Sequence, residues 1–170
     1  CVKLGIPHLT IPLSFMHQYF KSSLLDGADA IPEGHYEEEN MKSTVVPFRN
    51  GIMLAIATGI AESHELKRVY IANHGGDHTI YPDCRPEFIH AMNGATEAGT
   101  FVKVRVEAPY TEITKTEIVA RGAALGIDYS KTWSCYKGAD IHCGKCGTCV
   151  ERKEAFEAAG VKDPTIYSKD

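Results

Sequence analysis

The amino-acid sequence predicts an α/β fold: a Rossmann-like parallel sheet flanked by helices, followed by a metal-binding C-terminal segment. Short apolar runs alternate with helical patterns over about the first 125 residues, an order typical of parallel sheets. Four of the six cysteines then fall within a single stretch, residues 135–149. With 170 residues, the chain is long enough for one domain with its own hydrophobic core.

The first elements follow from apolar content and from glycine and proline punctuation. Residues 8–15 are rich in Leu and Ile and predict a short strand. Residues 22–43 are polar, with an acidic run at 37–39, and have the composition of a long loop. Such a loop is either a binding loop or lid, or a surface excursion. Residues 49–62 are almost continuously apolar and predict a helix buried on most of its surface.

The middle of the chain supplies two more strands and a helix. Residues 69–72 form a compact apolar run, which predicts a buried strand of a parallel sheet. Residues 86–98 carry apolar side chains at helical spacing, and Gly99 is placed to end that helix. Residues 102–106 alternate Val with Lys and Arg, which indicates a strand with one solvated face.

The best-marked helix is predicted at residues 114–125. Thr114 and Glu117 have the spacing of a capping box, in which each side chain bonds the other residue's backbone N–H. A last short helix is predicted at residues 150–159. In parallel sheets, ligands bind where strands end and helices begin. The polar residues that follow the strand at 69–72 are therefore candidates for a site.

The first residues resemble the last turn of a helix. Gly5 is followed by Pro7, and the same Leu-Gly-Ile cadence recurs where Gly126 follows the helix at 114–125. We therefore expect the chain to lack a segment that precedes Cys1. A frayed start with a chance Gly-Ile-Pro is the alternative interpretation.

Composition narrows the class of protein. The formal net charge of -4 argues against a broad nucleic-acid-binding surface, which is usually basic. No uninterrupted apolar run reaches the roughly 18 residues of a membrane helix, and no secretion signal opens the chain. We expect a cytoplasmic protein that binds neither nucleic acid nor membranes.

The cysteine cluster predicts a metal centre. Cys135, Cys143, Cys146 and Cys149 follow the pattern C-x7-C-x2-C-x2-C. Thiolates two residues apart can both reach one ion, and four sulfurs favour a closed, structural zinc site. An iron–sulfur cluster uses the same ligands, and a redox C-x-x-C pair or disulfides are weaker alternatives. His142, inside the cluster, is interpreted as a solvent-facing loop residue rather than a ligand.

Three further stretches can be read together with the cysteines. They are Val46-Pro47-Phe48-Arg49-Asn50, Tyr81-Pro82-Asp83-Cys84-Arg85-Pro86-Glu87-Phe88 and Trp133-Ser134-Cys135-Tyr136. In this order and spacing they resemble the 7-cyano-7-deazaguanine synthase family, within the ATP-pyrophosphatase-loop superfamily. The resemblance covers nearly the whole chain. It implies an adenine nucleotide alpha-hydrolase-like domain over residues 1–170, with a zinc-binding subregion at 133–160.

The resemblance also implies a reaction. Family members convert 7-carboxy-7-deazaguanine and ammonia to the nitrile with ATP and Mg²⁺, through adenylylated intermediates, in queuosine biosynthesis, and a homodimer is expected. The family's Ser-Gly-Gly-x-Asp-Ser phosphate loop is absent from this sequence. We therefore expect this fragment alone to be inactive.

The candidate site residues combine suitable side-chain chemistry with a position near a predicted strand end or helix start. Asp77 and Lys115 are the candidate catalytic residues, and the candidate substrate- and ATP-binding residues are Arg49, Asn50, Tyr81, Asp83 and Arg85. Several have structural alternatives: Arg49 could pair with a carboxylate, and Asp77 and Asp83 could each cap a helix. Lys115 opens a helix, where a cation is unfavourable unless it has a partner or a ligand.

Two rival functions remain open from the sequence. A sibling enzyme of the superfamily could adenylylate another substrate, as an amidating ligase, a tRNA-modifying enzyme or a deazaguanine-transferring relative. A zinc-stabilised binding module without enzymatic activity is the second rival. The acidic composition counts against that second rival when the partner is a nucleic acid.

Overall fold

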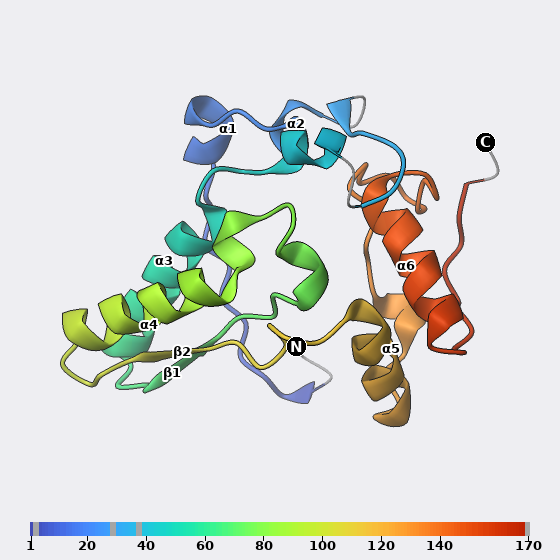
Figure 1. Cartoon of the computed structure of the whole chain (residues 1–170). Coiled ribbons are helices and arrows are strands. Elements are labelled where there is room, and N and C mark those ends of the chain that lie inside the picture. The colour runs from blue at the N-terminus through green and yellow to red at the C-terminus, as the bar shows by residue number, and fades with distance from the viewer. Residues whose placement is uncertain (2–3, 28–29, 37–38, 169–170) are drawn as a thin grey trace.

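The computed structural model describes residues 1, 4–27, 30–36 and 39–168. Figure 1 shows two strands with helices α3 and α4 beside them, and α5 and α6 together in the other half of the molecule. The elements in chain order are α1 Phe15–Tyr19, α2 Ser23–Asp26, η3 Glu39–Thr44, α3 Arg49–Ser63, β1 Arg68–Tyr70, η4 Gly75–Asp77, η5 Pro82–Cys84, α4 Pro86–Gly99, β2 Arg105–Glu107, α5 Lys115–Ala124, η6 Tyr129–Lys131 and α6 Gly147–Ala158.

The sheet in the described residues consists of β1 and β2, which pair in parallel with Val69 opposite Val106. Helix α3 packs against β1, and α4 packs against β2. This confirms the predicted class, an α/β fold with a parallel sheet. The prediction that β1 is buried is wrong: Tyr70 is 64% exposed. A strand is buried only when both of its faces are covered.

Residues 8–13 do not form the predicted strand. Their backbone pairs with no strand among the described residues, and a β-strand is defined by such pairing. Their apolar side chains instead line one side of a groove of about 460 Å³ whose other side is α3 and β1. The Leu- and Ile-rich composition therefore reflects packing rather than strand pairing.

The long polar stretch at 22–43 contains the short helix α2 and the 3-10 helix η3, and positions 37 and 38 of its acidic run lie outside the described residues. Tyr36 and Met41 are buried against Ile80, Tyr81 and Cys84. This part of the stretch is therefore packed into the core and is not a simple surface excursion.

The predicted helices are all present. Helix α5 begins with the capping box expected: Glu117 Oε2 accepts from the Thr114 N–H at 2.8 Å, and Thr114 Oγ1 accepts from the Glu117 N–H at 3.2 Å. Gly5 and Gly126 both have positive φ, 63° and 70°. The next residue's N–H in each case bonds the carbonyl five residues back. The shared cadence therefore does mark a shared turn geometry.

One segment of the described chain, Glu39–Ser63, is long and apolar enough to cross a membrane by length and composition alone. Its helical structure is interrupted between η3 and α3, where Phe48 has φ of 53°. Helix α3 packs against β1 and α4 on one side. The prediction that it is buried on most of its surface is wrong: of its 15 residues only Gly51, Leu54, Thr58 and Ala61 are buried.

Candidate active site and metal centre

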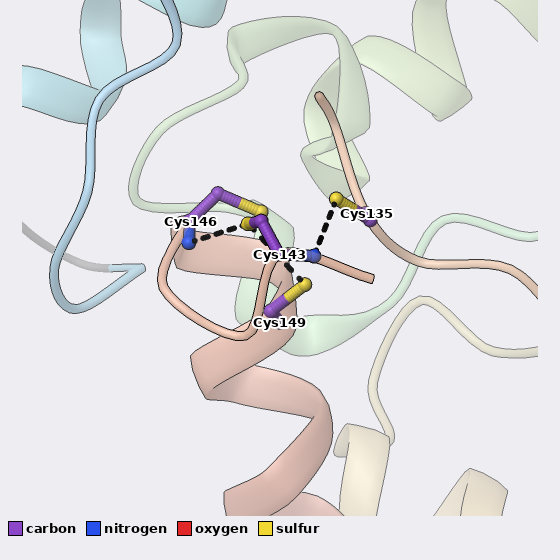
Figure 2. A group of neighbouring side chains, drawn as sticks. All are labelled: Cys135, Cys143, Cys146 and Cys149. Carbon is purple, nitrogen blue, oxygen red and sulfur yellow. Dashed lines mark hydrogen bonds between the residues drawn. The ribbon is translucent and has the colours of Figure 1, made fainter. Parts of the chain in front are cut away.

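The four cysteines converge in the folded chain, as predicted. Their sulfur atoms all lie within 4.8 Å of one another (Figure 2), and those of Cys143 and Cys149 are 3.9 Å apart. Four ligands about 2.3 Å from a central zinc ion would be separated by about 3.8 Å, the edge of that tetrahedron. The spacing therefore fits a metal ion held by four thiolates.

The surroundings of the sulfurs suit thiolates. The backbone N–H groups of Cys146 and Lys145 donate to Cys143 Sγ at 3.3 and 3.4 Å, and the N–H of Cys143 donates to Cys135 Sγ at 3.3 Å. A hydrogen bond from Cys149 lowers the pKa of Cys146. Cys146 and Cys149 are fully buried. The cluster is closed to solvent at these two cysteines, as structural metal sites are.

His142 lies outside the group of four converging sulfurs, and it is not solvent-facing. Its side chain is buried, its ring centroid lies 4.1 Å from that of Trp133, and its Nε2 accepts from the Ser134 N–H at 3.1 Å. The prediction of an exposed loop histidine is wrong because the rings of Trp133 and Tyr167 pack against this side chain, with the Tyr167 ring centroid 5.8 Å away. Burial lowers the pKa of His142, which favours the neutral ring that this hydrogen bond requires.

Two adjoining cavities lie at the ends of β1 and β2. The larger cavity, about 570 Å³, is lined by residues that include Tyr36, His74, Asp77, Lys115 and Arg121. The smaller cavity, about 260 Å³, is lined by Tyr36, Arg49, Asn50, Ile71, Ala72, Asn73, Asp77, Tyr81, Cys84 and Tyr136. Tyr36, Ala72, Asp77 and Tyr136 line both, so the two cavities meet along them.

Asp77 occupies the boundary between the cavities. Its Oδ2 accepts from the His74 N–H at 3.1 Å, and its Oδ1 accepts from the Tyr36 hydroxyl at 3.1 Å. The carboxylate thus closes its own 3-10 turn, η4, rather than capping the next helix. Asp77 also lines both cavities, so the same residue stabilises the turn and borders the candidate site.

Arg49, Asn50 and Tyr81, three of the candidate binding residues, line the smaller cavity. The side-chain amide of Asn50 already has partners within the protein: Nδ2 donates to the Asp83 carbonyl at 3.1 Å and to Cys84 Sγ at 3.2 Å. The Tyr81 hydroxyl lies 2.8 Å from Thr44 Oγ1.

Asp83 and Arg85 lie outside the lining of both cavities. Asp83 Oδ2 accepts from the Asn50 N–H at 2.9 Å, so it caps α3, the preceding helix, and not the following one. Arg85 Nε donates to the His78 carbonyl at 2.9 Å. Burial raises the pKa of the Cys84 thiol to about 12, which keeps it protonated and unsuited to act as a nucleophile.

Several site residues were missed from the sequence. Tyr136, which follows Cys135, places its hydroxyl 3.1 Å from that of Tyr81. Burial raises the pKa of Tyr136, so its phenol stays protonated. Asn73 is 4% exposed; its Nδ2 donates to the Cys84 carbonyl at 2.6 Å, but its Oδ1 is buried without a hydrogen-bond partner. The place of Asn73 directly after a strand was the available signal.

A buried charged cluster lies beside the larger cavity. Lys115 forms an ion pair with Glu151, and Glu151 Oε1 lies 3.9 Å from His74 Nε2. Burial raises the pKa of Glu151 despite the opposing effect of Lys115, and burial lowers the pKa of His74. His74 Nδ1 accepts from the Gly76 N–H at 3.1 Å, which fits a neutral ring with its proton on Nε2.

Comparison with known proteins identifies the family to which this sequence belongs. The family model described as queuosine biosynthesis protein QueC matches residues 1–160. A protein named 7-cyano-7-deazaguanine synthase from Porphyromonas gingivalis strain ATCC 33277 is 66% identical over 165 residues, 97% of this chain and 75% of that protein. A protein of the same name from Desulfotalea psychrophila is 52% identical, over 98% of this chain and 76% of that protein. The chain thus belongs to the QueC family of queuosine biosynthesis proteins.

Proposed function

We propose that this protein is a 7-cyano-7-deazaguanine synthase, which acts in queuosine biosynthesis and converts 7-carboxy-7-deazaguanine and ammonia to the nitrile with ATP. The membership of the QueC family and the relatives that bear this name support the proposal. The single structural observation that carries it is the pair of adjoining cavities, one rich in acceptors and one containing Lys115.

The reaction needs two activations of the same carbon. A carboxylate is a poor electrophile, so its oxygen attacks the α-phosphorus of ATP, pyrophosphate leaves, and an acyl-adenylate forms. Ammonia displaces AMP to give the amide. The amide oxygen is then adenylylated by a second ATP, and loss of AMP and a proton leaves the nitrile. Magnesium would neutralise phosphate charge during both adenylylations.

The smaller cavity suits the deazapurine. A guanine-like ring presents an N–H and an exocyclic amine on one edge, which need acceptors. Asp77 offers a carboxylate there, and the Asn73 Oδ1 is an unpaired buried acceptor, which is costly unless a ligand supplies a donor. Arg49 lines the same cavity and can pair with the substrate carboxylate in bidentate fashion.

The larger cavity suits the nucleotide. Lys115 and Arg121 both line it, and both cations lie on α5, with Lys115 at the helix N-terminus. Backbone N–H groups at a helix N-terminus attract phosphate, and the two cations add to that attraction. In this arrangement Asp77, Tyr36 and Tyr136 lie between the two ligands. The acyl-adenylate would form at that boundary.

We also propose zinc as the ion of the four-cysteine centre, held by Cys135, Cys143, Cys146 and Cys149 in a structural role. The four thiolates can form a complete ligand set, and the 3.9 Å between the sulfurs of Cys143 and Cys149 is close to the ligand–ligand distance of a tetrahedral zinc site. Elemental analysis of the purified protein measures it, and iron with acid-labile sulfide would overturn it. The cytoplasmic location and the homodimer remain predictions, and native mass spectrometry measures the oligomeric state.

The test of the reaction uses the full-length, metal-loaded protein with 7-carboxy-7-deazaguanine, ATP, Mg²⁺ and ammonium, with products read by mass spectrometry. We expect the nitrile together with AMP. AMP without nitrile, or no turnover from folded protein, would contradict the proposal and favour the sibling enzyme.

Two variants test the cavity assignment. Asp77→Asn and Asn73→Ala should each raise the KM for the deazapurine at least about tenfold, because each loses an acceptor worth about 1.4 kcal/mol or more. The KM for ATP should change much less. Asn40→Ala, at an exposed asparagine, is the matched control. Equal changes in both KM values would argue against separate cavities.

A further inference from the structure

Glu151 has no role in the chemistry described so far, yet it is among the less exposed carboxylates of the described structure. Its side chain is 14% exposed, and it lies beside the larger cavity against Lys115 and His74. A buried carboxylate is costly unless it is paired. We infer that Glu151 is a positioning residue through which the four-cysteine centre fixes Lys115 at the cavity.

The first step of this argument is the origin of helix α6. Cys146 is the residue that precedes the helix, and the Cys149 N–H donates to the Cys146 carbonyl at 2.8 Å in the first turn. Two of the four sulfurs therefore belong to the start of this helix (Figure 2). Residues two apart on an α-helix point about 200° apart. Cys149 consequently faces the metal centre while Glu151 faces away, toward α5.

The second step is the position of Lys115. It is the first residue of α5, which is held in place by the reciprocal hydrogen bonds of Thr114 and Glu117. A cation at a helix N-terminus is opposed by the helix dipole. The ammonium is nevertheless only partly exposed, paired with Glu151 and 5.5 Å from the centre of the Tyr36 ring. Glu151 compensates for the unfavourable position.

The third step is the space around the pair. A methyl group on Gly76 would lie 3.1 Å from Glu151 Oε1 and 3.0 Å from the His74 ring, so the turn η4 is shaped closely around this carboxylate. Helices α5 and α6 pack together, as Figure 1 shows. The metal centre thus fixes the residue at which α6 begins. Helix α6 in turn fixes the position of the Glu151 carboxylate, and that carboxylate fixes the position of the Lys115 ammonium group. One hydrogen of Lys115 is used by Glu151, which leaves two for an anionic ligand.

The significance of Lys115 for catalysis rests on the proposed function, but its positioning can be tested without any substrate. A brief pulse with an amine-reactive reagent, followed by peptide mass spectrometry, measures the reactivity of each lysine. In the metal-loaded protein we expect Lys115 to react at least about fivefold more slowly than the exposed Lys131, an effect equivalent to about 1 kcal/mol.

The variant Glu151→Ala should retain the full metal content and raise the labelling of Lys115 at least about fivefold. Glu157→Ala, at an exposed glutamate of the same helix, should leave it unchanged. Removal of the metal by a chelator should raise Lys115 labelling as Glu151→Ala does. Unchanged labelling in a Glu151→Ala protein that keeps its metal would overturn the inference.

A double-mutant cycle in turnover separates positioning from a general structural role. If Glu151 acts through Lys115, the change Glu151→Ala should lower kcat/KM for ATP in the wild-type background but have almost no effect in Lys115→Ala. Equal effects in both backgrounds would refute action through Lys115. If the proposed reaction is absent, the labelling result still stands, so the two failures are distinguishable.

Discussion

The buried pair of Arg152 and Asp163 gives the sharpest test of how the C-terminal half is held together. The Arg152 side chain is 5% exposed and that of Asp163 is 14% exposed. Arg152 Nη2 donates to Asp163 Oδ1 at 3.1 Å, and Nε lies 3.2 and 3.3 Å from the two carboxylate oxygens. Asp163 also accepts from the Tyr167 hydroxyl at 2.6 Å. The carboxylate thus joins α6 to the last described residues.

The perturbation is Asp163→Asn, which removes the charge and keeps the shape. Breaking a buried ion pair costs about 3–5 kcal/mol, because the remaining charge is left uncompensated. The new amide retains one acceptor oxygen, and Arg152 keeps its 2.8 Å bond to Thr132 Oγ1. We therefore expect the lower end of that range, a loss of about 3 kcal/mol in the free energy of unfolding.

The assay is urea unfolding of the metal-loaded protein followed by tryptophan fluorescence. Trp133 is the only tryptophan in the sequence and stacks on His142, close to this pair. Asp140→Asn, at an exposed aspartate of the same region, is the control and should change stability by less than about 0.5 kcal/mol. A loss below about 1 kcal/mol for Asp163→Asn would refute the reasoning.

The same carboxylate predicts a pH dependence. Burial opposes ionisation of Asp163, but hydrogen bonds from Arg152, Tyr167 and Thr165 outweigh it and lower its pKa to about 2. A pKa lowered by folding adds stability that is present above the ordinary value of 3.8 and is lost as pH falls toward 2. The stability difference between wild type and Asp163→Asn should therefore shrink below about pH 4. If the stability difference between the two proteins stays constant as the pH falls, the ionised Asp163 carboxylate is not its source.

Three other changes have defined outcomes. Cys146→Ser should lose the metal and lower the melting temperature, since thiolate ligation contributes folding energy; full metal occupancy with an unchanged melting temperature would contradict this. Asp83→Ala should cost about 1 kcal/mol in urea unfolding, because it removes the side chain that caps α3 through the Asn50 N–H. Gly76→Ala should lower the melting temperature by crowding Glu151, whereas Gly94→Ala, in an exposed helix with open space, should not.

Local chemistry was predictable from the sequence where neighbouring residues determine the structure. The capping box at Thr114 and Glu117 and the left-handed Gly126 involve partners within five residues, and both were confirmed. The cysteine cluster was predictable because Cys143, Cys146 and Cys149 are close in the chain.

Features that depend on distant partners were not predictable. Residues 8–13 have strand composition, but strand formation requires a neighbour, and none pairs with them in the described chain. Asp83 was placed among the binding residues although its carboxylate caps α3, 33 positions earlier in the chain. Glu151 was missed because its partner Lys115 is 36 residues away. No local pattern reports such contacts.

The location of the buried charges follows from the way the two halves of the chain meet. The α/β half contributes His74 and Asp77 from the turn after β1, and α6 contributes Glu151 beside Lys115 of α5. Apolar packing alone would join these parts without a polar cavity between them. Charges retained at such a junction cost stability unless a ligand or a partner offsets them. Because two of the four clustered cysteines lie at the start of α6, we expect ligand binding at this junction to depend on the integrity of the four-cysteine centre.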